Sequence, residues 1–122
     1  MVLLLIFIGG GLGSLCRYGI GQLLPYSGAF PWATFCINLL ACFVLGFVLG
    51  WISRQAPDAP LANNMKWLLA TGFCGGFSTF STFSNETLTM IKAGQWVLAG
   101  VYVGLSIVLG LLALALGTAL RF

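Results

Sequence analysis

Histidine is absent from this chain of 122 residues, and acidic and basic residues together make up only 6% of it. An average soluble domain is about 25% charged, so the chain lacks the polar surface that keeps a globular protein in solution. The only acidic residues are Asp58 and Glu86, which argues against a paired-carboxylate reaction within one chain. We therefore do not expect an enzyme.

Several kinds of site are also missing. Zinc sites draw on His, Cys and carboxylates, and the four cysteines form no CxxC pair. All four lie in apolar stretches, which indicates small buried residues rather than a disulfide framework. No Walker or dinucleotide-binding glycine motif is present. A net charge of +3 on five scattered basic residues is not typical of a nucleic-acid surface, so we expect no nucleic-acid partner.

The chain is rich in long runs without any charged residue, which cover 1–16, 18–53, 67–85 and 93–120. A membrane-spanning helix needs roughly 20 mostly apolar residues. Pro25 and Pro31 divide the second run by a turn, because proline interrupts helices. The sequence thus predicts an all-α integral membrane protein with one domain, 1–122, and four transmembrane helices at about 3–24, 32–53, 66–92 and 95–120. The tryptophans fall near these predicted helix ends, where they favour the membrane interface: Trp32, Trp51, Trp67 and Trp96.

Glycine accounts for 17 residues and recurs at helical spacing. Each predicted span contains two glycines four residues apart: Gly9/Gly13, Gly46/Gly50, Gly72/Gly76 and Gly100/Gly104. Such pairs let helix backbones approach closely in lipid, either within one chain or between subunits. Four short helices alone enclose no obvious water-filled channel, so a transport function would require an oligomer.

The charge distribution leaves the orientation in the membrane open. Arg54, Lys66 and Arg121 are predicted on the side of the N-terminus. Lys92 is predicted on the other side, and Arg17 snorkels toward that side. This difference is small under the positive-inside rule. The chain could therefore insert in both directions and form an antiparallel homodimer, although chance in the composition explains the balance equally well.

The most informative stretch is 71–86, TGFCGGFSTFSTFSNE. Gly72, Gly75 and Gly76 cluster in the middle of the third predicted span, and a helix break near Gly75-Gly76 would release backbone carbonyls to a cation. Irregular backbone is tolerated at that depth only where it is buried in protein or faces water, and broken helices commonly mark ion sites in transporters. The alternative is that the glycines only allow close packing of an intact helix.

Aromatic and hydroxyl residues alternate directly after these glycines. Residues three apart share a helix face, so Phe77, Phe80 and Phe83 are expected to form one ladder. The hydroxyl residues that flank it are Ser78, Thr79, Ser81, Thr82 and Ser84. Phenyl edges carry partial positive charge and hydroxyls donate hydrogen bonds. This face therefore suits a small, hard anion, although an aromatic stripe is also typical of core packing.

Polar residues in the other spans extend this set. Thr34 and Asn38 are four apart, as are Tyr102 and Ser106. An unpaired amide in an apolar medium costs about 2–7 kcal/mol, so Asn38 needs a partner, which is either a neighbouring helix or a conduction path.

Two charged residues require separate interpretation. Arg17 lies within the first span, where a charge is a candidate for function; it either draws anions into a vestibule or anchors the span. Glu86 lies about 28 Å beyond Trp67 at 1.5 Å per residue, so we expect it at the far interface, where a carboxylate needs no function.

Together these motifs resemble the Fluc/CrcB family of fluoride channels. The matching segments are 9–18 (GGGLGSLCRY), 31–38 (PWATFCIN) and, most specifically, 72–83 (GFCGGFSTFSTF). They occur in the family's order over nearly the whole chain. Ala33 and Ala41 stand where the family commonly has glycine, which bears on local helix packing rather than on the pore.

The resemblance implies an antiparallel, dual-topology homodimer in the bacterial inner membrane, with two fluoride pores and a structural sodium ion on the two-fold axis. Phe80 and Phe83 would turn their ring edges toward fluoride, and Asn38 would donate hydrogen bonds to it. Gly75 and Ser78 would each give a backbone carbonyl to sodium. The polar lining or vestibule would further include Arg17, Thr34, Ser81, Thr82, Glu86, Tyr102 and Ser106.

The residues fit passive conduction better than pumping. Fluoride is strongly hydrated, so a pore must replace its water with donors, whereas fixed positive charge in the narrow part would hold the ion too tightly for conduction. No histidine is present for proton coupling. One alternative is a small proton-coupled multidrug exporter, which needs a membrane-embedded carboxylate where the first span offers Arg17. Another is a non-transporting assembly subunit.

Overall fold

The computed structural model describes residues 1–24, 26 and 28–120. Two sequence predictions lie outside these residues: the role of Pro25 in the first turn and the position of Arg121 in the charge balance. The described residues form helices and no strand. Three helices are long and apolar enough to cross a membrane: α1 (Val2–Leu23), α2 (Trp32–Ile52) and α6 (Trp96–Ala119). The protein is therefore an all-helical, multi-pass membrane protein.

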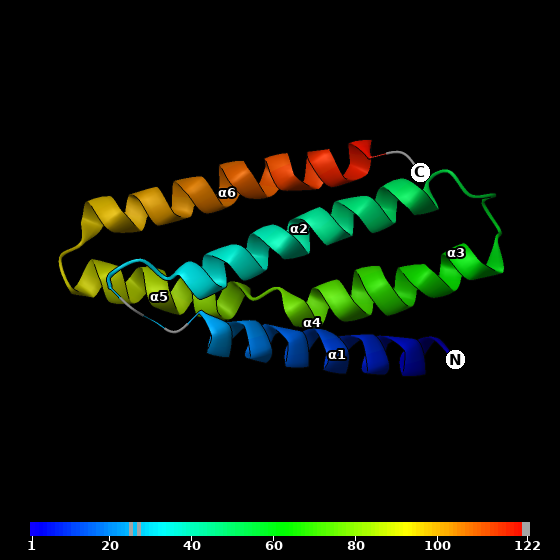
Figure 1. The fold of residues 1–122 in the computed structure, drawn as a ribbon, viewed down its shortest axis with the longest axis horizontal. Helices are drawn as coiled ribbons and strands as arrows, with labels where there is room; N and C mark the ends of the chain where they lie inside the picture. Colours follow the sequence, from blue (N-terminus) through cyan, green and yellow to red (C-terminus); the bar gives the residue numbers. More distant parts are fainter. Residues whose placement is uncertain (25, 27, 121–122) are drawn as a thin grey trace.

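A fourth helical rod runs beside these three and is broken into pieces (Figure 1). It consists of α3 (Pro60–Met65), the π-helix η1 (Lys66–Cys74), α4 (Gly75–Phe77) and α5 (Phe80–Lys92). The rods lie roughly side by side, and α3 lies near the N-terminus at the opposite end of the bundle from α5 (Figure 1). The rod begins at Pro60, six residues before the predicted start, because proline suits the first helical turn.

The break in this rod lies three residues later than the glycines predicted. The helix continues through Gly75 and Gly76 to Phe77, and the backbone is extended at Ser78 (φ −72°, ψ 156°) and Thr79 (φ −146°, ψ 108°). The break predicted near Gly75-Gly76 is therefore present, and its extended residues begin two positions after Gly76. The reason is that Gly76 is used for close helix packing, whereas Thr79 provides the N-cap of α5.

Glycines bring α1 against the broken rod without any intervening side chain. A methyl group added at Gly9 would collide with the Leu68 carbonyl, and one added at Gly76 would collide with the Gly10 carbonyl. Gly46 makes the same kind of approach to α6. The glycines of these helices therefore bring helices of one chain together, which is one of the two interpretations of the glycine spacing. Gly100 and Gly104 differ, because nothing in the described chain lies within 4 Å of a methyl added at either position.

Substitution of Gly76 by alanine is expected to destabilise the protein by about 1–3 kcal/mol, because overpacking of a tight contact costs this much. The added methyl group would meet backbone atoms of Gly10, which cannot move aside as a flexible side chain can. Thermal unfolding in detergent measures the effect. Gly11→Ala is the matched control, since a methyl at that position meets nothing within 4 Å. Equal losses for the two variants would contradict the close approach.

Candidate functional site

Asn38 holds the break in place through both backbone groups of Thr79. Its Oδ1 accepts a hydrogen bond from the Thr79 N–H at 2.9 Å, and its Nδ2 donates one to the Thr79 carbonyl at 3.2 Å. Asn38 therefore satisfies polar backbone that the interrupted helix leaves unpaired. These bonds use one of the two amide N–H groups, so the second is available to another acceptor. The structure thus gives Asn38 a helix-bridging contact without using all of its donors.

Thr79 in turn starts α5. Its Oγ1 accepts from the Thr82 N–H at 3.3 Å and donates to the Thr82 hydroxyl at 3.0 Å. This is a helix N-cap, which pairs one of the free N–H groups in the first turn. Thr79 and Thr82 are therefore fixed side by side at the break.

Arg17 and Ser14 approach the break from α1. The Arg17 Nε donates to the Gly76 carbonyl at 3.1 Å, and the Ser14 hydroxyl donates to the same oxygen at 3.4 Å. Gly76 lies in the last turn before the break, where helix carbonyls lack intrahelical partners and a cation is favourable. Arg17 is therefore bound within the bundle at the end of α4, rather than directed only toward the membrane interface.

A cavity of about 400 Å³ opens between these elements. Its polar lining combines Arg17 from α1 and Thr34 from α2 with Thr79 and Thr82 at the break. The complete lining is Ser14, Arg17, Tyr18, Gly21, Gln22, Ala33, Thr34, Ile37, Thr79 and Thr82. Arg17 is the only charged residue in this lining. The Arg17 guanidinium and the Thr82 hydroxyl, whose hydrogen is not used in its bond with Thr79, make the cavity suited to an anion.

Glu86 lies at the centre of a hydrogen-bonded cluster, whose residues the family resemblance assigned to one polar lining or vestibule. The Thr34 hydroxyl donates to Glu86 Oε1, and the Tyr102 hydroxyl donates to Oε2 at 3.0 Å. Tyr102 is fully buried, and Thr34 is buried as well. Both carboxylate oxygens of Glu86 thus have partners on other helices. The position of Glu86 along its span predicted a residue at the interface that needs no function, whereas the family resemblance implied a place in the polar lining. The sequence did contain an indication of this cluster, because a carboxylate in an apolar chain is costly unless hydrogen-bond donors contact it.

The aromatic ladder is shorter than predicted. The rings of Phe80 and Phe83 lie 5.9 Å apart between centroids, and the Phe83 ring lies 5.0 Å from that of Tyr102. Phe77 does not continue this pair, because the extended residues Ser78 and Thr79 interrupt the helical spacing. Phe77 is instead buried and stacks on Phe73. The prediction of three phenylalanines on one face is therefore wrong for Phe77.

The remaining predicted site residues are not all brought together. Phe80 is 79% exposed on the single chain, and Ser81 next to it is also exposed. Ser106 follows Tyr102 by one helical turn, and its buried hydroxyl has no hydrogen-bond partner among the described residues. Such an orphaned donor marks a position where a further acceptor would be favourable.

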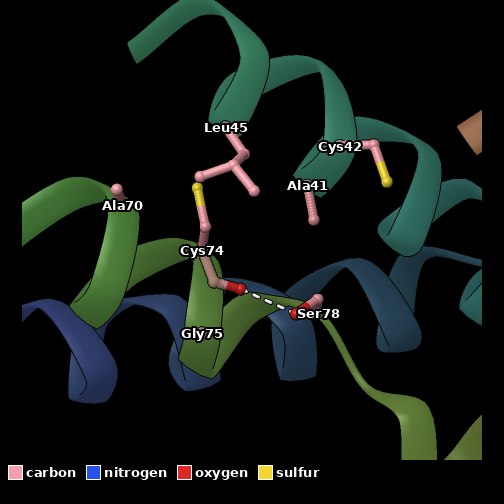
Figure 2. Close-up of a pocket in the computed structure, with 7 residues that line it drawn as sticks. All are labelled: Ala41, Cys42, Leu45, Ala70, Cys74, Gly75 and Ser78. Atoms are coloured by element: carbon pink, nitrogen blue, oxygen red, sulfur yellow. Dashed lines mark hydrogen bonds between the residues drawn. The ribbon is translucent and has the colours of Figure 1, made fainter. Parts of the chain in front are cut away.

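The break also leaves a backbone carbonyl without its regular helical donor next to a second cavity. In a regular helix the Thr79 N–H would donate to the carbonyl four residues earlier, that of Gly75, but it donates to Asn38 instead. Gly75 and Ser78 line a second cavity of about 200 Å³ between α2 and the η1–α4 segment (Figure 2). The Ser78 hydroxyl donates to the Cys74 carbonyl at 2.8 Å, which turns it back toward the helix. Backbone carbonyl oxygens, such as those of Gly75 and Ser78, are the kind of oxygen that hard cations prefer.

Comparison with known proteins gives consistent matches over almost the whole chain. A family model described as "CrcB-like protein, Camphor Resistance (CrcB)" matches residues 4–118. A protein of Phocaeicola vulgatus named "Fluoride-specific ion channel FluC" is 43% identical over 117 residues, covering 94% of this chain and 93% of the relative. "Fluoride-specific ion channel FluC 1" of Mycobacterium bovis is 42% identical, covering 94% and 86%. A "Fluoride-specific ion channel FluC" of Ignicoccus hospitalis is 39% identical, covering 90% and 86%.

Proposed function

This chain belongs to the CrcB family, and on that premise we propose that it is a fluoride-selective ion channel through which fluoride leaves the cytoplasm passively. It is a channel rather than an enzyme, and the family sets aside the small multidrug exporter as an alternative. The observation that carries the proposal is the cavity of about 400 Å³ at the helix break, where the Arg17 guanidinium and the Thr82 hydroxyl are available to an anion. We place the protein in the bacterial inner membrane, surrounded by lipid.

The lining accounts for how fluoride can enter and still leave. Arg17 attracts the anion to the cavity, but its Nε is bound to the Gly76 carbonyl, which keeps the charge at the cavity wall. Beyond it, the second N–H of Asn38 and the Thr82 hydroxyl, whose hydrogen is not used in its bond with Thr79, replace water around the ion. Neutral donors bind fluoride less tightly than a fixed cation would, and conduction needs such balanced binding.

The polar residues on the far side of the break extend this path. The Phe80 and Phe83 rings offer partially positive edges, and the unpaired hydroxyl of Ser106 offers a donor on α6. Ser81 belongs to the same lining. Glu86 accepts from Thr34 and Tyr102, so its role is to orient these two hydroxyls beside the path rather than to bind the anion.

We propose that two chains form an antiparallel homodimer with two pores. Phe80 is 79% exposed on one chain, although a ring that contacts a conducted ion must be enclosed by protein. Gly100 and Gly104 form a small-residue surface that no part of the described chain covers. A second copy would cover such surfaces, and the nearly balanced charges permit both orientations in the membrane.

Fluoride selectivity is the direct test of this function. Purified protein reconstituted into liposomes is expected to release fluoride far faster than chloride, because only the smaller, more strongly accepting ion matches a lining of closely spaced donors. Ion-selective electrodes measure both fluxes in parallel preparations, and protein-free liposomes give the background. Equal rates for the two anions would contradict the proposal.

We propose that the carbonyls of Gly75 and Ser78, two residues that line the second cavity, hold a structural sodium ion together with the same two carbonyls of a second chain. Their regular helical donors are missing at the break, and sodium would supply the positive charge that holds the two breaks together. Replacement of sodium by a large organic cation is therefore expected to weaken the dimer and to lower fluoride flux. Size-exclusion chromatography and the fluoride electrode measure the two effects. A dimer that is equally stable and active without sodium would argue against the carbonyl site.

A further inference from the structure

A row of aromatic rings leads from the helix break to one end of the bundle. It begins with the Phe80–Phe83 pair and continues from Phe83 to Tyr102. The Phe30 ring lies 5.4 Å from the Tyr102 ring between centroids, with an angle of 80° between their planes. Trp32 ends the row, with its ring 4.5 Å from that of Phe30. The T-shaped contact of Phe30 with Tyr102 is a favoured aromatic geometry, so it contributes to where the Tyr102 ring lies.

Phe30 is held by the backbone at the start of α2, at the same end of the bundle as the connection between α5 and α6 (Figure 1). The Trp32 N–H donates to the Phe30 carbonyl at 3.0 Å, and Pro31 between them has φ −82° and ψ 74°. These values are typical of an inverse γ-turn. Pro31 is buried, and its carbonyl accepts from the Phe35 N–H at 3.1 Å. The turn therefore places the Phe30 ring against the buried residues at this end, which include Tyr102.

We propose that Phe30 is a positioning residue for fluoride conduction and that it acts through the hydroxyl of Tyr102. The inference rests on the proposed function, and Phe30 itself is not part of the lining of the anion cavity. Tyr102 is fully buried, and its hydroxyl donates to Glu86. Because the ring and the hydroxyl of tyrosine move as one rigid unit, the packing of the ring decides where the hydroxyl lies. Removal of the Phe30 ring leaves space beside Tyr102, into which this unit can tilt away from Glu86.

The Tyr102 hydroxyl connects Phe30 to the anion cavity. Glu86 accepts from Tyr102 through Oε2 and from Thr34 through Oε1, and Thr34 lines the cavity. If Tyr102 tilts away, one carboxylate oxygen loses its donor, and a buried charged group without its partner is costly. Glu86 then reorients and takes the Thr34 hydroxyl with it. The Phe30 ring thus keeps one wall of the cavity in its conducting arrangement.

Phe30→Leu is the direct test, since leucine keeps an apolar side chain but removes the ring. Fluoride flux from liposomes is expected to fall by about three- to tenfold, because an aromatic pair contributes this much beyond its buried area. Phe30→Tyr keeps the ring and is expected to retain most of the flux. Trp96→Leu is the matched control, because Trp96 is 66% exposed at the start of the helix that carries Tyr102. Thermal unfolding in detergent identifies any variant that loses flux because it is unfolded.

A double-mutant cycle with Tyr102→Phe separates the positioning of the hydroxyl from packing alone. Tyr102→Phe keeps a ring beside Phe30 but has no hydroxyl to place. If Phe30 acts by placing this hydroxyl, Phe30→Leu will change flux by less than about twofold in the chain that already carries Tyr102→Phe. Equal losses from Phe30→Leu with and without the Tyr102 hydroxyl would overturn the proposed role.

A fluorinated tyrosine reports the position of Tyr102 without any measurement of flux. In the Tyr18→Phe/Tyr26→Phe protein Tyr102 is the only tyrosine, so fluorine NMR in detergent observes this residue alone. We expect one narrow resonance that shifts, broadens or splits with Phe30→Leu and stays unchanged with Trp96→Leu. This measurement also decides the case in which Tyr102→Phe alone abolishes flux. An unchanged resonance in Phe30→Leu would overturn the positioning role, whereas equal fluoride and chloride flux in the unaltered protein would count against the proposed function instead.

Discussion

Replacement of Asn38 by alanine is expected to lower fluoride flux by about a hundredfold or more, which is the largest loss expected for any single side chain at the break. A hundredfold change in rate corresponds to about 2.8 kcal/mol. The variant leaves the N–H and the carbonyl of Thr79 without their partners. Each buried polar group left unsatisfied costs about 1–3 kcal/mol. The variant also removes the amide donor proposed to face fluoride. Fluoride efflux from liposomes and thermal unfolding in detergent measure the two losses on the same preparation.

Two further variants separate the structural role from the ion-binding role. Asn38→Asp keeps an acceptor for the Thr79 N–H but removes the amide donor and adds negative charge, so we expect it to lose flux while it retains more stability than Asn38→Ala. Asn85→Ala is the matched control, because Asn85 is exposed on α5 and its recorded hydrogen bond uses only its backbone carbonyl. Unchanged flux in Asn38→Ala would remove Asn38 from the proposed path.

The three helices that are long enough to cross a membrane could be predicted from the charge and proline pattern alone. The absence of charge over about 20 residues is a property of the local sequence, and the predicted ranges 3–24, 32–53 and 95–120 overlie α1, α2 and α6. The position of the break could not be predicted in the same way. It depends on Gly76, which α1 needs for close packing, and on Asn38, which is 41 residues away from Thr79. Glycine raises the local tolerance for irregular backbone, but distant partners decide where the helix ends.

For the candidate site as well, the sequence predicts which residues are polar but not which partners they contact. Thr34, Asn38 and Tyr102 could be selected as polar residues in apolar helices, because each such residue must find a partner. Which partner each one finds depends on how the helices are placed around the bundle. Glu86 was therefore grouped with Thr34 and Tyr102 only through the family resemblance, because they lie 52 and 16 residues away from it. Helical spacing likewise predicted Phe77 beside Phe80, but that rule holds only within a continuous helix.

Substitution of Phe80 or Phe83 by isoleucine is expected to slow fluoride flux by about two- to tenfold while the proposed dimer stays intact, because aromatic geometry contributes about 0.5–1.5 kcal/mol beyond buried area. Isoleucine remains large and apolar but lacks the partially positive ring edge, so the change tests the edge and not the bulk. Phe83 also contacts the Tyr102 ring. Fluoride electrodes measure the flux, and size-exclusion chromatography measures the dimer.

Phe7 on α1 provides the control that this prediction requires. On the single chain it is 78% exposed, compared with 79% for Phe80, so the two rings differ in location and not in exposure. If both rings only face lipid, Phe7→Ile and Phe80→Ile will have the same small effect on flux. If Phe80 is enclosed by a second chain at the helix break, only Phe80→Ile will slow the ion. Equal behaviour of the two variants would therefore remove the aromatic edges from the pathway, and with them the strongest reason to enclose Phe80 in a dimer.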